Sequence, residues 1–201
     1  MTKDLEDLLE ALEDADDATR EEAAKALAAI ADPRSLDALI GACGDEYWSV
    51  RAYAASALAK LGGSPATEAL IGLFNDPIME VRNQAVEAAA SLGMAVLDRM
   101  IAALKDERWR VREHAAKTCG EIRDHKAVDA LIVACRDRDG AVKSAAAEAL
   151  GKIGDPKAVP IMIKLFRDSS KIVRETAGTA LVYIGEPSVD PLIECFKDKD
   201  F

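Results

Sequence analysis

The stretch Asp137–Arg167, DRDGAVKSAAAEALGKIGDPKAVPIMIKLFR, contains the pattern that decides the fold. Its first half places apolar and small residues at helical spacing and ends at Gly154, and glycine best tolerates the left-handed conformation that follows many helices. Asp155 and Pro156 then combine a capping side chain with proline at a first helical position. A second apolar stripe follows at residues 159–166. The stretch therefore predicts two consecutive helices.

The same pattern recurs along the whole chain with a period of about 31 residues. A Val-Arg, Val-Lys or, in the first copy, Thr-Arg dipeptide marks each repeat, and its basic residue advances by 31, 31, 30, 31 and 31 positions. These basic residues are Arg20, Arg51, Arg82, Arg112, Lys143 and Arg174. An aspartate lies six residues before each of them, and an alanine follows three residues after. Such regularity predicts a solenoid in which each repeat packs mainly against its neighbours.

The repeats predict a single all-α domain over residues 1–201, built as a right-handed α-α superhelix. Residues 1–13 align with the second helices and form one N-terminal capping helix. Six two-helix repeats follow at residues 14–44, 45–75, 76–105, 106–136, 137–167 and 168–197, which makes thirteen helices in all. Residues 198–201 match the opening of a further repeat.

The turn between the two helices of a repeat carries a recurring capping signal. Asp32-Pro33, Ser64-Pro65 and Asp155-Pro156 each place a capping side chain before proline. We therefore expect the second helix of these repeats to begin there. The aspartate that opens each repeat is expected to cap the first helix, and the basic residue to reach a neighbouring repeat.

The repeat resembles the short HEAT repeat of the phycobilisome-lyase type. The shared pattern is D-x-x-x-x-V-R-x-x-A-A-x-A-L-x-x-I-G-D-P-x-A-V-x-x-L-I-x-x-L, and residues 137–167 match it best. The resemblance covers nearly the whole chain, which is also similar to artificial proteins built from a consensus of this repeat. It implies that the second helices line a concave face and that the protein is a scaffold or adaptor binding another protein there. The alternative that it implies is a bilin-lyase-like or chaperone-like subunit acting on a chromophore-carrying protein.

The charge of the chain is negative and unevenly distributed. The net charge is −10; residues 1–104 carry 8 basic and 19 acidic side chains, and residues 105–201 carry 18 and 17. A nucleic-acid-binding protein needs a basic stripe, which the first half lacks. An acidic surface suits a protein partner with a basic segment. One basic run, Lys105, Arg108, Trp109, Arg110 and Arg112, hints at phosphate binding, but a solvated helix end explains it more simply.

The residues that usually carry catalysis or metal binding are sparse. Cys43, Cys119, Cys135 and Cys195 lie far apart without a CxxC motif, which favours free thiols in a reducing cytosol. Deoxyhypusine hydroxylase, a relative with similar architecture, binds iron through His-Glu dipeptides, whereas neither histidine here precedes a glutamate. We expect no metal, no cofactor and no catalytic residue. The chain also lacks an apolar run of about 18 residues that would span a membrane.

A column of acidic residues is the first candidate partner-binding feature. Asp37, Glu68, Asp98 and Asp129 occupy the same position of successive second helices, as does Asp190 in the last one. Because neighbouring helix axes lie about 8–10 Å apart, these carboxylates are expected to form an evenly spaced row. Acidic residues in a first helical turn also suit the helix dipole, which is the alternative explanation.

A column of large apolar residues is the second candidate. Trp48, Met79 and Trp109 open successive first helices, and Tyr47 precedes Trp48. Leu73, in a second helix, is counted with this group. If these side chains are exposed, they form a patch of the kind that marks a protein-binding site. Packing between helix ends is the alternative.

The outward positions of the second helices are mostly small. They are Ala38, Gly41, Ala42, Ala69, Gly72, Ala102, Ala103, Ala130 and Ala134. Small residues here either let successive helices approach closely or leave a smooth trough for a partner's helix or strand.

Overall fold

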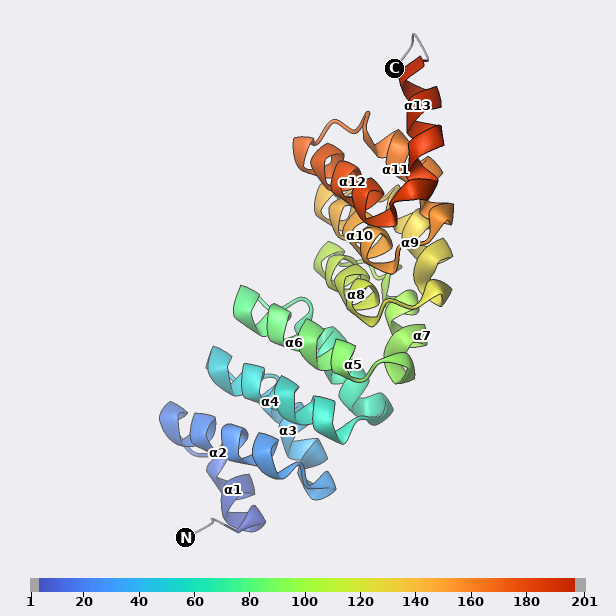
Figure 1. Ribbon diagram of the computed structural model, residues 1–201. Coiled ribbons are helices and arrows are strands. Elements are labelled where there is room, and N and C mark those ends of the chain that lie inside the picture. Colours follow the sequence, from blue (N-terminus) through green and yellow to red (C-terminus); the bar gives the residue numbers. More distant parts are fainter. Residues whose placement is uncertain (1–3, 198–201) are drawn as a thin grey trace. The chain divides into compact units, whose positions relative to one another are not determined.

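The computed structural model describes residues 4–197, and within this range the chain is all-helical (Figure 1). The first helices of the repeats are α2 (Asp17–Ile30), α4 (Trp48–Leu61), α6 (Met79–Ser91), α8 (Trp109–Ile122), α10 (Gly140–Ile153) and α12 (Lys171–Ile184). The second helices are α1 (Leu5–Ala11), α3 (Leu36–Ala42), α5 (Gly63–Leu73), α7 (Met94–Ala103), α9 (Val128–Ala134), α11 (Val159–Leu165) and α13 (Val189–Lys197). These thirteen α-helices confirm the predicted capping helix and six helix pairs. The segment 198–201, expected to open a further repeat, lies outside the described residues.

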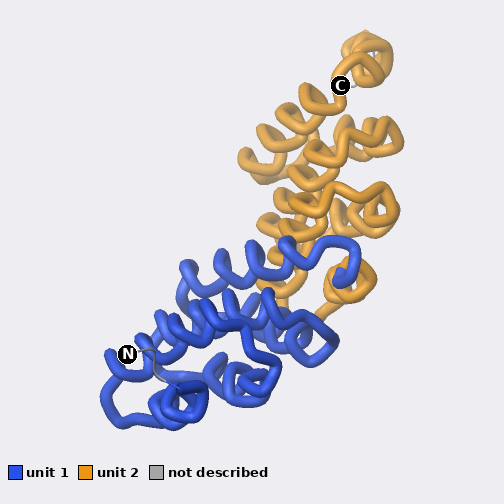
Figure 2. Tube along the Cα trace, turned by 60° about the horizontal axis from the view of Figure 1, so that its bottom comes forward, with its two compact units in different colours: residues 1–96 blue, residues 97–201 orange. Residues whose placement is uncertain are grey.

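The helices form two compact units, which meet in sequence within α7. Unit 1 extends to Val96 and unit 2 begins at Leu97 (Figure 2). In unit 1, α2, α4 and α6 pack side by side, and α3 and α5 cover them. In unit 2, α8, α10 and α12 pack side by side, and α9 and α11 cover them. Each unit therefore has a layer of first helices and a layer of second helices.

Two of the three predicted capping residues before proline, Asp32 and Asp155, form the expected hydrogen bond, and Ser64 does not. The side chains of Asp32 and Asp155 each accept a hydrogen bond of 2.9 Å from the backbone N–H two residues later. They open short 3₁₀ turns, Pro33–Ser35 and Pro156–Ala158, that lead into α3 and α11. The expectation for Ser64 was wrong, because α5 already begins at Gly63 and no side chain caps it. The N-cap residue is Gly62, which has no side chain that could accept a hydrogen bond.

Unusually close helix packing in unit 2 depends on two glycines. A Cβ atom at Gly120 of α8 would lie 2.8 Å from Cα of Ala149 in α10. A Cβ atom at Gly151 of α10 would likewise lie 2.8 Å from Cα of Ala180 in α12. Only glycine leaves room for this approach, which draws the three first helices of unit 2 into one tight layer.

Candidate functional site

The repeating basic residue and aspartate form a ladder within each unit. Arg51 donates from Nε and Nη2 to the two carboxylate oxygens of Asp76, at 2.6 and 2.9 Å. Its Nη1 also donates to the backbone carbonyl oxygens of Asp45 and Glu46, at 2.8 and 3.1 Å. The pairs Arg20–Asp45 and Arg112–Asp137 join other successive repeats in the same way, and Lys143 joins the next pair through a single contact with one carboxylate oxygen of Asp168. The prediction that the basic residue reaches a neighbouring repeat is therefore confirmed for Arg20, Arg51, Arg112 and Lys143. Arg82 differs, because its Nη1 donates to carbonyl oxygens of its own loop and its buried Nε has no hydrogen-bond partner among the described residues.

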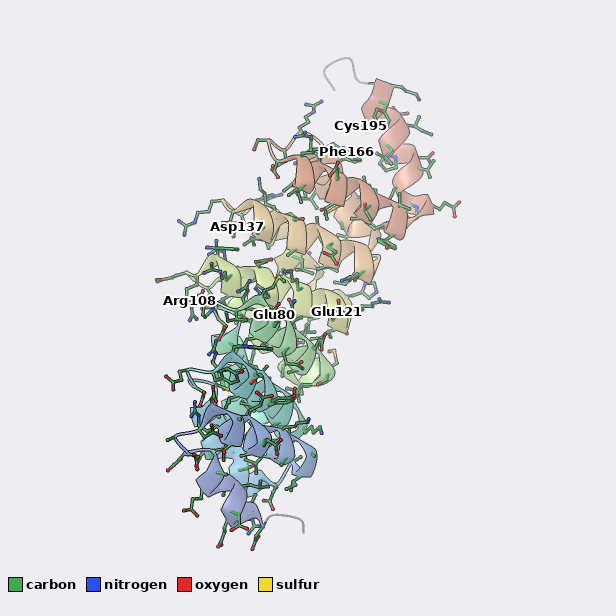
Figure 3. All side chains as sticks on the ribbon, turned by 90° about the vertical axis from the view of Figure 1, so that its left-hand side faces the viewer. Glu80, Arg108, Glu121, Asp137, Phe166 and Cys195 are labelled. Atoms are coloured by element: carbon green, nitrogen blue, oxygen red, sulfur yellow. The ribbon has the colours of Figure 1, made fainter. Side chains whose placement is uncertain are left out.

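The ladder aspartates hold the loop before each first helix rather than capping the helix itself. Asp137, labelled in Figure 3, accepts the backbone N–H of Asp139, which is the residue before α10, at 2.8 Å. Burial raises the pKa of Asp137, but hydrogen bonds from Arg112 and from that N–H outweigh burial and bring the pKa below 3.8. The pKa of Asp168 is lowered chiefly by its hydrogen bond from Lys143. These carboxylates thus stay ionised in a structural role.

The exposed aromatic and methionine side chains lie where first helices begin. In unit 1, Trp48 at the start of α4 is 42% exposed and Met79 at the start of the neighbouring α6 is 56% exposed, with Tyr47 also at the surface. In unit 2, Trp109 at the start of α8 is 39% exposed. The guanidinium of Arg110 lies 4.9 Å from the centre of the Trp109 ring, a cation–π contact. Because these side chains expose apolar surface, they remain part of the candidate site.

Leu73 does not share this surface. Only 5% of it is exposed, so it contributes to the core of unit 1 and offers no area to a partner. Ala103 and Ala134, which occupy the same column of other second helices, are also buried. The sequence pattern placed this column outward, whereas the structure turns it towards the first-helix layer. Leu73 is therefore removed from the candidate site.

The acidic column is exposed, but in unit 2 its charge is largely countered. Lys126 Nζ lies 2.5 Å from a carboxylate oxygen of Asp98, and Lys157 Nζ lies 2.5 Å from one of Asp129. Each lysine comes from the 3₁₀ turn of the following repeat. Asp37 on α3 and Glu68 on α5, the members of the column in unit 1, are exposed as well. The expected row of acids is thus partly a row of ion pairs.

A groove of about 570 Å³ lies on the second-helix face of unit 2, between α7 and α9. Ile101 lines it from α7, Leu104 lines it just after the end of α7, and Ala130 and Val133 line it from α9. Val133 is 63% exposed, so a large apolar side chain stands in an open groove. An exposed aliphatic side chain in a concave setting suits a partner's apolar side chain better than it suits water.

Sequence reasoning missed this groove, although one column contains the signal. The position of Val133 is occupied in the other repeats by Gly41, Gly72, Ala102, Lys164 and Glu194. Val133 is the one large apolar residue among these six positions. Comparing the column residue by residue, rather than noting that it is mostly small, would have singled it out.

A second groove, of about 720 Å³, lies between α10 and α12 on the first-helix face of unit 2. It is lined by Glu148 and Lys152 from α10 and by Ile172 and Tyr183 from α12. Lys152 pairs with Glu148 at 2.7 Å and with Glu121 of α8 at 2.8 Å. Ion pairs therefore already occupy much of the polar lining of this groove.

The basic residues of the run around Trp109 form separate contacts. Arg112 belongs to the ladder, Arg110 stacks on Trp109, and Arg108 pairs with Asp106 of the same loop at 2.9 Å. Figure 3 shows Arg108 at the edge where the first helices of unit 2 begin and Glu121 at the opposite end of α8. Lys105 lines the groove between α7 and α9. The run is thus spread over several contacts and does not form one basic surface.

The four cysteines are free thiols, two of them buried and two half-buried. Cys119 and Cys135 are buried, and burial raises the pKa of each thiol to about 12. Cys43 is half-buried, and burial raises its pKa to about 12 as well. Cys195 is half-buried on α13. Thiols with such high pKa values are poor nucleophiles.

Among residues 4–197, no three His, Cys, Asp or Glu side chains are grouped so that they could hold a metal ion. Instead, His125 Nδ1 lies 2.8 Å from the Asp155 carboxylate. Of the helices in this range, none has the length and apolar character needed to cross a membrane.

Comparison with protein families agrees with the repeat geometry. The family model described as HEAT repeats matches residues 5–90, 70–139 and 128–201, which together cover nearly the whole chain. The chain belongs to the HEAT repeat family. The match is to HEAT repeats in general, so the narrower phycobilisome-lyase type remains a resemblance. No curated protein matches the sequence.

Solved structures with the same architecture include designed and natural solenoids. An engineered protein of the Northeast Structural Genomics Consortium is 23% identical, with 92% of this chain and 98% of that chain covered and a TM-score of 0.51. A designed armadillo repeat protein in complex with the peptide (KR)4 is 20% identical, with 91% and 100% covered and a TM-score of 0.53. A structure of Kap95p bound to RanGDP is 15% identical, with 91% and 30% covered and a TM-score of 0.70.

At these identities the likeness shows the fold alone. The fold is nevertheless informative, because HEAT and armadillo-like repeats are typical of protein-interaction scaffolds. In this HEAT repeat chain, the ladder aspartates and most basic residues are already engaged within the fold. The accessible features are the groove between α7 and α9, the exposed side chains at the starts of first helices, and exposed acids of unit 1 such as Asp37.

Proposed function

We propose that this HEAT repeat protein is a scaffold that binds a segment of a partner protein on its second-helix face, the face that the sequence predicts to be concave. The observation that carries the proposal is the groove between α7 and α9, in which Val133 stands exposed beside Ile101. Burying exposed aliphatic area contributes about 25 cal/mol per Å². A partner side chain that covers Val133 and removes it from water therefore makes a favourable contribution to the free energy of binding.

The second-helix face of unit 1 is compatible with the same role. At Gly41 on α3 and Gly72 on α5, no heavy atom lies within 4 Å of the position that a Cβ atom would take. These glycines therefore face open space and leave the surface smooth. A protein of similar fold, the designed armadillo repeat protein, is in complex with a peptide, which supports a peptide-like segment as the occupant.

The exposed charges and aromatic residues at other positions have subsidiary roles in this proposal. Asp37 and Glu68 lie on the second-helix face of unit 1, where they attract a basic part of a partner and raise the association rate. Trp48 and Met79 in unit 1, and Trp109 in unit 2, are anchors at the edge where first helices begin.

Site-specific crosslinking tests the face that is used. A photoreactive phenylalanine analogue replaces Val133 on the second-helix face or, as a matched control, Ile172, which is exposed on the first-helix layer. Each full-length variant is irradiated in a lysate of the source cells, and crosslinked peptides are sequenced. The proposal predicts one recurring partner peptide attached at position 133 and absent at position 172. A partner attached only at position 172 would show that the other face binds.

A further inference from the structure

The second helices of unit 2 end in a column of basic residues that unit 1 lacks. The residue immediately before each repeat's aspartate is Lys105, Arg136, Arg167 and Lys197 in unit 2, and all four are exposed. The corresponding residues of unit 1 are Glu13, Gly44 and Asn75. Over their whole length, residues 1–96 carry 7 basic and 18 acidic side chains, whereas residues 97–201 carry 19 and 18. The negative charge of the chain therefore belongs to unit 1.

Two of these cations, Lys105 and Arg136, line the groove between α7 and α9. Their side chains form no ion pair or hydrogen bond with any residue in the range 4–197. Most other cations near the groove are engaged, Arg112 in the ladder and Lys157 with Asp129. Lys105 and Arg136 thus present their full charge to whatever enters.

The acids that line the same groove do not cancel this charge. Asp137 receives two hydrogen bonds from Arg112, at 2.7 and 2.9 Å. Asp129 is paired with Lys157 at 2.5 Å. Each acid is thus matched by its own cation, which leaves the groove with a net positive potential from Lys105 and Arg136.

We propose that the groove between α7 and α9 binds a segment of a partner protein that carries an apolar side chain flanked by carboxylates. The apolar side chain covers Val133 and Ile101, and the carboxylates pair with Lys105 and Arg136. This inference rests on the proposed function and specifies its partner. It differs from the basic segment suggested by the net charge of the whole chain, because that charge is concentrated in unit 1.

The spacing of the two cations limits the form of the segment. Adjacent second helices lie about 8–10 Å apart, so the carboxylates that pair with them are separated by about the same distance. An extended chain advances about 3.3 Å per residue, which places suitable carboxylates three residues apart. A basic residue at a helix C-terminus also stabilises the helix dipole. However, α3 and α5 of unit 1 end without one, so a second helix of this repeat forms without a basic residue at its end.

Peptide selection on the full-length protein tests the partner chemistry. Random twelve-residue peptides displayed on phage are selected against the native sequence, the double variant Lys105→Gln/Arg136→Gln, and Val133→Glu. Arg123→Gln, which removes one positive charge away from this groove, is the control, since Arg123 is exposed and lines the groove on the first-helix face. Thermal melting confirms that each variant is folded. The native protein and the control are expected to enrich peptides with acidic residues about three positions apart around an aliphatic or aromatic residue.

The affinity of a selected peptide then separates the two proposals. The double variant is expected to weaken binding about fivefold or more at low salt, and the difference should shrink in about 1 M salt, where charges are strongly screened. Peptides without acidic enrichment that bind the double variant normally, but not Val133→Glu, would overturn the acidic partner and leave the groove as a binding site. Failure to enrich any peptide, or enrichment indifferent to Val133→Glu, would overturn both.

Discussion

Arg51 donates two parallel hydrogen bonds, of 2.6 and 2.9 Å, to the carboxylate of Asp76 and so joins two successive repeats of unit 1. Both side chains are buried, with about a tenth of Arg51 and a twentieth of Asp76 left accessible. The same guanidinium also closes the loop that precedes its own helix. A single side chain thus holds both the loop of one repeat and the junction with the next.

Removing this guanidinium is expected to destabilise the protein strongly. Arg51→Met keeps much of the side-chain volume but leaves the Asp76 carboxylate buried without its cation, which typically costs about 3 kcal/mol or more. Arg34→Met is the control, because Arg34 pairs with Asp32 at 2.8 Å but is 72% exposed. Exposed pairs contribute about 1 kcal/mol or less. Urea unfolding of both variants measures the free energy of unfolding. Equal losses of stability would show that the buried Arg51–Asp76 pair stabilises the protein no more than the exposed pair does.

Acid should weaken the ladder. The pKa of Asp168 is lower in the folded protein than its ordinary value of 3.8, because Lys143 donates a hydrogen bond to the ionised carboxylate. The stabilisation is therefore complete above about pH 4 and is lost as the pH falls further. Asp168→Asn should lower the free energy of unfolding at about pH 6 and reduce its fall towards about pH 3.

The control for this pH dependence is Glu186→Gln, a change at an exposed acid that forms no ion pair within residues 4–197. It should preserve the native pH profile. An Asp168→Asn protein with the native slope would show that the Lys143–Asp168 pair does not contribute to acid sensitivity.

The glycines between first helices of unit 2 should not tolerate a methyl group. Gly120→Ala places Cβ 2.8 Å from Cα of Ala149, so the backbones must move apart. Such overpacking typically costs about 1–3 kcal/mol and outweighs the better helix propensity of alanine. Gly41→Ala on α3 meets no atom within 4 Å and should instead stabilise by about 0.5–1 kcal/mol. Calorimetric melting that moves both variants in the same direction would contradict the packing described for α8 and α10.

The exposed tryptophans should act on binding more than on folding. Trp48→Ala and Trp109→Ala remove side chains that are 42% and 39% exposed. A buried anchor at an interface typically costs about 2 kcal/mol or more when truncated, mainly through faster dissociation. Surface plasmon resonance with the crosslinked partner measures this rate, and melting temperatures are recorded in parallel. Variants that melt early yet bind normally would assign both tryptophans to the fold.

The sequence predicts the fold nearly completely because its signals are local and repeated. First helices begin at Trp48, Met79 and Trp109, as predicted. The predicted contact of the basic residue with the next repeat is present at four positions, Arg20, Arg51, Arg112 and Lys143. Ser64 fails as a cap because the helix start depends on how Gly62 and Gly63 turn, which the Ser-Pro motif does not encode.

The candidate site could be predicted only in part. The exposure of Trp48, Met79 and Trp109 agrees with their position in the repeat, but Leu73 is buried because a helical column near the edge of a stripe can face either layer. The apolar lining of the groove depends on Val133, which replaces the small or charged residue found at this position in the other repeats. Lys105 and Arg136 have no ion-pair partner within the described residues because the nearby acids Asp137 and Asp129 are paired with Arg112 and Lys157. Such information comes from three-dimensional contacts and not from the period.

The affinity of the crosslinked partner segment for two charge-insertion variants tests the central claim most directly. Val133→Glu places a carboxylate in the groove between α7 and α9, whereas Ile172→Glu places one on the first-helix layer at a similarly exposed site. With the partner segment synthesised as a peptide and binding measured by isothermal titration calorimetry, Val133→Glu should weaken affinity about tenfold or more, about 1.4 kcal/mol, and Ile172→Glu should leave it unchanged. Unchanged affinity in a folded Val133→Glu protein, or a loss confined to Ile172→Glu, would contradict binding on the second-helix face.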